Sequence, residues 1–286
     1  MDQRIIDLYD EYTHGGSSRR QFLDRLARLA GGAAAAAALL PILQNDYAHA
    51  ALVPEGDERL TIDTVAWAAG ETKLSGYLAR LKGGAKRPAV IVIHENRGLN
   101  AHIKDVARRL AVEGFLALAP DMLSPAGGTP ADEDRARELI GGLDAGATLA
   151  GLAAAVSFLA AHAESNGKVG AVGFCWGGAM ANQLAAAGTP LAAAVAYYGR
   201  QLPAADVPKI SAALMLHYAG LDQRVNAGIA EYEAALKAAG KAYELHMYDG
   251  ANHAFNNDTN AARYDKAAAD LAWGRTVAFL RSRLAQ

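Results

Sequence analysis

The sequence predicts an α/β protein with a mostly parallel central sheet and helices on both faces of that sheet. Two observations support this fold class. Six short apolar runs recur from residue 89 onward, and they are continuous rather than alternating, as expected of strands that are buried on both faces. Amphipathic segments with helical spacing separate these runs, and parallel neighbouring strands require such a crossover.

The expected elements follow in chain order. Residues 59–69 and 72–81 have no helix between them, so they are predicted to pair antiparallel at one edge of the sheet. Buried strands are predicted at 89–94, 115–120, 168–174, 191–198, 212–218 and 243–248. Helical segments are predicted at 101–114, 131–163, 177–187, 225–239 and 261–284. No linker rich in Pro and Gly divides residues 51–286, so this part is expected to form one domain.

Composition excludes several classes of protein. Hydrophobic residues make up 52% of the chain and charged residues 20%, which predicts a globular protein with enough apolar surface for a large core. The 28 basic and 30 acidic residues give a net charge of -2, and no basic block is present, so nucleic acid is not expected as a partner. The chain has one cysteine, which cannot form an intramolecular disulfide. Its thiol is therefore either buried and inert or reactive.

Residues 1–50 are predicted to be an export signal. The run "SRRQFL" contains the pair Arg19 and Arg20 and resembles the twin-arginine signal, whose cargo usually crosses the membrane already folded. An Ala/Leu-rich stretch follows at 33–43, and residues 48–50 read as an A-x-A cleavage site. These features predict the twin-arginine export machinery as a partner and a periplasmic or exported product that begins at residue 51.

No membrane attachment is expected after removal of this signal. The apolar stretch is short and is interrupted by Pro41, which argues against a spanning helix. The alternative is a plain N-terminal helix that packs its leucine face on the domain of a cytoplasmic protein.

The only cysteine, Cys175, lies in the run "GFCWGG" at the predicted turn from a strand into a helix. Gly173 and Gly177 stand two positions before and after it, which matches the G-x-S-x-G nucleophile elbow with Cys in place of Ser. Side chains at those two positions would collide in so tight a turn. At a helix N-terminus the dipole and the free amides favour thiolate, the form that attacks carbonyls. The alternative is an inert cysteine in a Gly-rich turn.

Chain order favours the catalytic interpretation. A nucleophile elbow requires an acid and then a histidine on loops after later strands, and Asp222 and His253 follow the strands predicted at 212–218 and 243–248. His253 would accept the thiol proton or form an ion pair with the thiolate, and Asp222 would orient its ring. Taken singly, Asp222 reads as a helix N-cap and His253 as a surface histidine. Together with Cys175, in this order, they predict a catalytic triad.

Five motifs in order, "HENRG", "PDM", "GFCWGG", "AGLD" and "GANHAF", resemble the dienelactone hydrolase family of α/β hydrolases across about residues 58–285. The resemblance implies an α/β-hydrolase fold and a carboxymethylenebutenolidase-like activity. By that resemblance, Cys175, Asp222 and His253 are the triad.

The resemblance also assigns roles around the triad. Glu95 of "HENRG" would help to ionise the thiol when substrate arrives, although a glutamate in this loop otherwise reads as a solvated surface charge. The backbone N–H groups of Trp176 and Asn96 would form the oxyanion hole.

Two arginines that bind the substrate carboxylate in dienelactone-cleaving members are not evident in this chain. Ser124 and Pro125 follow the "PDM" motif, and Asn257 stands four positions beyond His253. A neutral lactone or ester is therefore the expected substrate, unless Arg97 or Arg200 supplies a cation from another direction.

The predicted function is hydrolysis of a small-molecule ester or lactone through an acyl-enzyme. No metal or organic cofactor is expected, because no cluster of His, Cys and Asp at ligand spacing is present in the sequence. Two alternatives stay open. One is an inactive member of the fold that binds an apolar ligand beside Trp176, Tyr197 and Tyr198. The other is a single-cysteine thiol redox protein, which the absence of a resolving cysteine disfavours.

Overall fold

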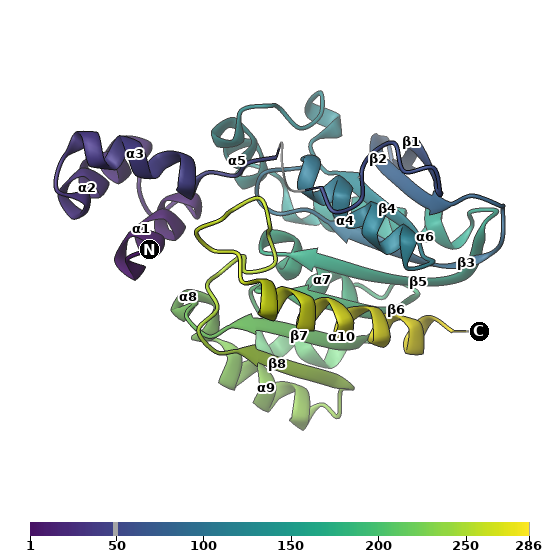
Figure 1. Cartoon of the computed structure of the whole chain (residues 1–286). Helices are drawn as coiled ribbons and strands as arrows, with labels where there is room; N and C mark the ends of the chain where they lie inside the picture. Colours follow the sequence, from purple (N-terminus) through teal and green to yellow (C-terminus); the bar gives the residue numbers. More distant parts are fainter. Residues whose placement is uncertain (48–50, 286) are drawn as a thin grey trace.

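An eight-stranded sheet forms the centre of the protein (Figure 1). The structure is a computed structural model, and it describes residues 1–47 and 51–285. The strand order is β1-β2-β4-β3-β5-β6-β7-β8. β1 pairs antiparallel with β2, and β2 pairs antiparallel with β4, while the other neighbours are parallel. The predicted fold class, including the antiparallel pair at the edge, is confirmed. The strands are β1 Leu60–Ala69, β2 Thr72–Leu81, β3 Arg87–Ile93, β4 Leu116–Asp121, β5 Ser165–Phe174, β6 Leu191–Tyr197, β7 Ala213–Ala219 and β8 Tyr243–Tyr248.

Helices cover both faces of this sheet. α4 and α10 pack on one face with an apolar cluster that includes Val106 and Leu280, and α6, α7 and α9 pack on the other face with Leu152 and Leu184. The helices after the first two strands are α4 Ala101–Val112, α5 Glu133–Gly141, α6 Ala145–Ala160, α7 Trp176–Ala185, α8 Gln223–Asn226, α9 Ile229–Ala238 and α10 Lys266–Leu284, with 3₁₀ turns at Ser124–Ala126 and Ala204–Lys209.

Three of the predicted helical segments differ from the observed ones, and each difference has a local cause. The segment 131–163 forms two helices, because Gly142 follows α5 and the Asp144 side chain then caps α6 by accepting a hydrogen bond from the backbone N–H of Ala147 at 2.7 Å. The segment 225–239 is interrupted at Gly228. The helix predicted from residue 261 begins at 266, because Asp265 is its N-cap.

The first 43 residues form three helices, α1 Gln3–Thr13, α2 Arg19–Ala30 and α3 Ala33–Leu43, which lie beside the end of the sheet where the parallel strands finish (Figure 1). We call α1 to α3 the N-terminal segment. Its own apolar cluster buries Tyr9, Phe22, Leu26 and Leu43. Arg19 and Arg20 are the first two residues of α2. Ser18 and Gln21 form a capping box at the N-terminus of this helix.

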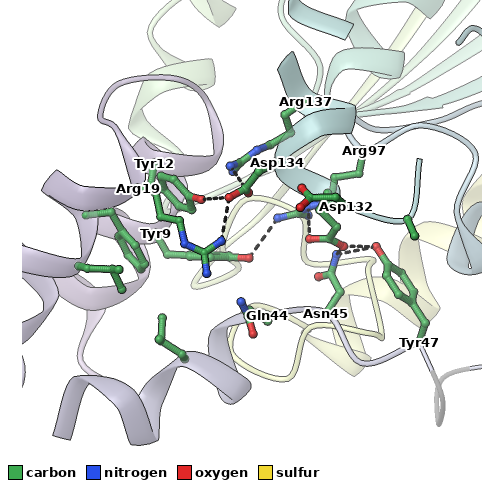
Figure 2. Close-up of a pocket in the computed structure, with 15 residues that line it drawn as sticks. Tyr9, Tyr12, Arg19, Gln44, Asn45, Tyr47, Arg97, Asp132, Asp134 and Arg137 are labelled. Atoms are coloured by element: carbon green, nitrogen blue, oxygen red, sulfur yellow. Dashed lines mark hydrogen bonds and ion pairs between the residues drawn. The ribbon is translucent and has the colours of Figure 1, made fainter. Parts of the chain in front are cut away.

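The N-terminal segment contacts α5 and the loop after β3 (Figure 2). Tyr12 donates a hydrogen bond to Asp134 at 2.7 Å, and the Arg19 guanidinium pairs with the same carboxylate at 3.0 Å. Arg97, from the loop after β3, donates to the Tyr9 hydroxyl at 3.1 Å. These contacts are polar and directional, so they fix the orientation of the segment as well as its position.

The structure leaves the export prediction untested. The predicted cleavage site, residues 48–50, lies outside the described residues. Within residues 1–47 and 51–285, no single helix is long and apolar enough to cross a membrane. Two sharply bent helix pairs, α2 with α3 and α5 with α6, meet that test by length and composition when each pair is taken together.

Candidate active site

Cys175 sits at a nucleophile elbow between β5 and α7. Its backbone adopts φ 53° and ψ -112°, a conformation that L residues rarely adopt, and its side chain is 9% exposed. The geometry shows why glycine is needed at the two positions predicted from sequence. A Cβ on Gly173 would stand 1.9 Å from the backbone O of Gly177, and one on Gly177 would stand 2.3 Å from the backbone O of Ile93. The turn therefore presents the thiol at the N-terminus of a ten-residue helix.

His253 and Asp222 are joined as the sequence predicted. Asp222 follows β7 and caps α8, accepting from the backbone N–H of Val225 at 3.1 Å, and its other oxygen lies 2.5 Å from His253 Nδ1. Burial opposes ionisation of Asp222, but the charge and hydrogen bond of His253 outweigh it and lower the pKa of the carboxyl. Asp222 is thus an ionised group that fixes the orientation of the His253 ring.

The thiol contacts a different histidine. His14, the residue that ends α1, places Nε2 3.2 Å from Cys175 Sγ. Among the described residues no hydrogen bond joins Cys175 to His253, and His253 Nε2 is buried without a partner. The three side chains nevertheless converge, because one ligand atom from each lies within 4.8 Å of the others, and the two imidazole rings meet edge to face at 4.7 Å. The structure therefore joins the predicted acid and histidine, Asp222 and His253, but the histidine in contact with the thiol is His14.

Glu95 is buried, and it contacts Asn257 rather than the thiol. Asn257 donates to Glu95 Oε2 at 2.8 Å, and Glu95 Oε1 is buried with no partner among the described residues. Asn257, which the sequence analysis found where dienelactone-cleaving members carry an arginine, thus binds this acid.

The backbone N–H groups of Trp176 and Asn96 are free for the predicted oxyanion hole. Neither group donates a hydrogen bond to another described residue. The Asn96 side chain donates to the backbone O of Thr13 at 2.8 Å, so the N-terminal segment also touches the loop that carries this predicted donor.

A cavity of about 1050 Å³ opens above the thiol. Cys175, His14 and His253 line it, together with Trp176 and Tyr198. Tyr197, in contrast, is a core residue whose hydroxyl lies 2.7 Å from Thr276 Oγ1. Two of the three aromatic residues proposed from sequence for a ligand pocket, Trp176 and Tyr198, therefore line the cavity.

The cavity wall is rich in arginine. Arg19, Arg137, Arg200 and Arg224 line it with two acidic residues, Asp134 and Glu138. The Arg19 and Arg137 guanidinium groups pair with Asp134, while the exposed Arg200 side chain has no ion pair with a described residue. Arg97, the other cation considered from sequence, is buried against Glu133 at 2.9 Å and does not line the cavity.

The cluster of Cys175, His14 and His253 is also the set of side chains that could hold a metal. One thiolate and two imidazoles form a donor set that zinc accepts. Spacing along the chain could not reveal this set, because its members are separated by 161 and 78 positions.

Sequence reasoning missed His14 and Asp10, which is four residues earlier and lies beside its ring. The reason is that the whole segment 1–50 was interpreted as a leader. One signal was available, namely an acidic, amphipathic run "DLYDEYTH" that a minimal leader does not need, with Asp and His at the i, i+4 spacing of one helix face.

The sheet order, the elbow between β5 and α7, and the acid and histidine after later strands define an α/β hydrolase. The chain belongs to the dienelactone hydrolase family, whose model matches residues 74–284. A second family model, described as YqhI-like, matches residues 1–32.

Individual relatives support this assignment. A Saccharolobus solfataricus protein named carboxymethylenebutenolidase is 34% identical over 229 residues, covering 68% of this chain and 88% of its own. A Bradyrhizobium protein named as a 2-oxo-3-(5-oxofuran-2-ylidene)propanoate lactonase is 34% identical over 227 residues, covering 74% of this chain and 90% of its own. The crystal structure of a dienelactone hydrolase-like promiscuous phosphotriesterase from metagenomic libraries superposes with a TM-score of 0.70 at 29% identity, covering 79% of this chain and 99% of that one.

Proposed function

We propose that this protein hydrolyses carboxylic esters or lactones through a thioester on Cys175, with His253 and Asp222 as the acid–base pair. The observation that carries the proposal is the strained elbow, which presents a thiol at a helix N-terminus within 4.8 Å of a histidine whose other nitrogen is bound to a carboxylate. The names of the relatives, a carboxymethylenebutenolidase and a lactonase, support the choice of ester or lactone over other carbonyl substrates.

The reaction follows from these positions. The Cys175 thiolate forms a bond to the carbonyl carbon, and the displaced electron pair moves to oxygen, where the N–H groups of Trp176 and Asn96 would stabilise it. The ester C–O bond then breaks, and the leaving alkoxide takes a proton from an imidazolium. Water next gives a proton to His253 and attacks the thioester. The C–S bond breaks, and acid and thiolate are released.

A panel of lactones and short-chain esters, neutral and carboxylate-bearing, tests the reaction class directly. We expect time-dependent release of acid and alcohol from at least one activated member, with saturable kinetics. A protein that binds these compounds without turnover would instead support the ligand-binding alternative, and a protein that exchanges only with disulfides or peroxides would support the redox alternative.

Arg200 is proposed to set the preference for substrate charge. Its guanidinium lines the cavity and has no ion pair with a described residue, so it offers a charge-assisted hydrogen bond to a carboxylate, which is worth roughly 1.5–3 kcal/mol. Arg200→Ala should therefore lower kcat/KM about tenfold or more for a carboxylate-bearing lactone, and less than about twofold for its neutral analogue. The measurement is kcat/KM for the matched pair on both proteins. If the neutral lactone is preferred by the wild type and Arg200→Ala changes neither value, the expectation from sequence holds and this role of Arg200 is wrong.

Export is a separate proposal that rests on the pair Arg19 and Arg20 and on the A-x-A run at 48–50, which lies outside the described residues. Replacing both with lysine should retain the protein in the cytoplasm, because a twin-arginine receptor distinguishes arginine from lysine at these positions. Cell fractionation with an intact-mass measurement of the purified chain reports both location and cleavage. Arg25→Lys in the same helix is the matched control and should leave location unchanged. A wild-type protein that stays in the cytoplasm would end this proposal.

A further inference from the structure

The N-terminal segment brings a second histidine to the nucleophile. His14 Nε2 lies 3.2 Å from Cys175 Sγ, a distance within hydrogen-bond range for sulfur, and His14 lines the open cavity beside Cys175 and His253. The imidazole is therefore in contact with the atom that reacts, and the segment forms a wall of the cavity without filling it.

Asp10 holds this ring in place. His14 Nδ1 lies 2.8 Å from the backbone O of Asp10 and 3.3 Å from its carboxylate, so the proton of neutral His14 is expected on Nδ1 and Nε2 is left to accept. Burial opposes the charge on Asp10, but the charge of His253 and the hydrogen bond from His14 outweigh it and hold the pKa of Asp10 well below its usual range. The arrangement repeats that of Asp222 behind His253.

The groups that face His14 come from several elements. Cys175 and His253 lie on its Nε2 side, and Asp10 lies on its Nδ1 side with Arg224 at 3.5 Å and Arg263 at 3.7 Å from the Asp10 carboxylate. Burial lowers the pKa of His14, but the negative charge on Cys175 and the hydrogen bonds that the ring donates to Asp10 and Cys175 outweigh it, and the net direction is upward. The ring of His14 is thus placed between the thiol on its Nε2 side and the backbone O of Asp10 on its Nδ1 side.

The position of His14 is fixed from both sides of the segment. Asn96 donates to the backbone O of the preceding residue, Thr13, at 2.8 Å, and Tyr12 and Arg19 bind Asp134. A side chain that was merely close to the thiol would not need this set of directional contacts, whereas a proton acceptor must keep its distance within a few tenths of an ångström.

We propose that His14 is a catalytic residue, which takes the proton of the Cys175 thiol, and that Asp10 is its positioning residue. In this step the S–H bond of Cys175 breaks, an N–H bond forms at His14 Nε2, and a thiolate–imidazolium pair results. The leaving alkoxide then takes this proton from His14 Nε2. His253 Nε2 accepts a proton from the water that attacks the thioester, since its Nδ1–H is held by Asp222, and this proton returns to the released thiolate. The inference rests on the proposed function, since it assigns a role within that reaction, but it makes a claim about the resting enzyme that can be measured without substrate.

Alkylation of the full-length chain with iodoacetamide tests this claim. Cys175 is the only cysteine, so the reaction reports on that thiol alone. Because only the thiolate reacts, the rate followed from pH 5 to 10 gives the thiol pKa. We expect His14→Ala and His14→Gln to react about tenfold more slowly than the wild type at pH 6, with the rate profile moved upward by about one pH unit or more. His14→Gln retains a polar side chain of similar length, and so it separates loss of a proton acceptor from loss of packing.

Further variants locate the effect. Asp10→Asn should move the titration in the same direction by a smaller amount. His253→Ala should abolish turnover. It should not move the alkylation profile upward, because the His253 ring is not hydrogen-bonded to the thiol. Arg25→Ala, which removes an ion pair between α1 and α2 away from the cavity, is the matched control and should change neither measurement. Melting temperatures of all variants show whether the segment remains folded.

The outcomes that would overturn the proposal are distinct from those that would overturn the proposed function. If His14→Ala and His14→Gln keep the wild-type alkylation profile, or if His14→Ala hydrolyses substrate faster than the wild type, His14 is not the proton acceptor. A chain isolated from its native cells that begins at residue 51 would lack His14 and would also overturn it. If instead the alkylation profile shifts as expected and no ester or lactone is hydrolysed, His14 ionises the thiol and the reaction class is wrong.

Discussion

Cys175→Ala should lower kcat/KM for the best ester or lactone substrate by about a thousandfold or more while changing the melting temperature little. The elbow, the helix and the oxyanion donors remain in this variant, and only the atom that bonds to the carbonyl carbon is removed. Members of one nucleophilic unit fail together, so His253→Ala is expected to cost a similar factor. Initial rates at several substrate concentrations and a thermal melt on the same preparations provide the measurement.

Two further variants calibrate this loss. Asp222→Asn should cost less than either change, because an amide can still orient the His253 ring, although it no longer favours the imidazolium. His162→Ala alters a histidine outside the cavity lining, at the end of α6, and should retain wild-type kinetics. Turnover by Cys175→Ala at the wild-type rate would show that hydrolysis does not pass through the thiol.

Gly177→Ala should destabilise the protein by about 3 kcal/mol or more, which for a chain of this size lowers the melting temperature by roughly 6–12 °C. The added Cβ would stand 2.3 Å from the backbone O of Ile93 and 2.5 Å from that of His94. Both atoms belong to the backbone where β3 ends, so no side-chain rotation relieves the contact. Activity should fall as well, because any shift of α7 moves the thiol.

Gly274→Ala is the matched control for this substitution. Gly274 lies inside α10, and a Cβ there meets nothing within 4 Å. Alanine in a helix interior is favoured over glycine by about 1 kcal/mol, so the control should melt at the wild-type temperature or slightly above it. A Gly177→Ala protein that melts as the control does would mean that the turn is less tightly packed than the structure indicates.

The fold could be predicted from sequence because its causes are local. Continuous apolar runs at 89–94 and 168–174 predict strands that are buried on both faces. The observed strands β3 and β5 match these runs within a few residues. The helix boundaries at 142–144 and 228 were predicted wrongly. They depend on a single Asp or Gly that starts or ends a helix, and this local effect outweighs the apolar periodicity over only a few residues.

The candidate site was predictable only in part, for a physical reason. Cys175, Asp222 and His253 each follow a strand, and parallel strands deliver their carboxyl ends to one edge of the sheet, so chain order alone placed them together. The contact of His14 with Cys175 depends on how the N-terminal segment docks, which rests on side chains such as Tyr12 and Asp134 that are far apart in the chain. No periodic pattern encodes that docking. Arg200, in contrast, follows β6 and reaches the cavity wall by the same rule as the residues after the other parallel strands.

The docked state of α2 has a consequence for targeting. Arg19 forms an ion pair with Asp134, and the capping box winds both arginines into the first turn of a helix. If the proposed export occurs, a receptor for this pair would compete with Asp134 for Arg19. Recognition would then depend on two rates: the rate at which the N-terminal segment of the new chain docks, and the rate at which the chain meets the receptor. Both arginines stay exposed in the docked segment, so docking restrains this pair in a helix without covering it.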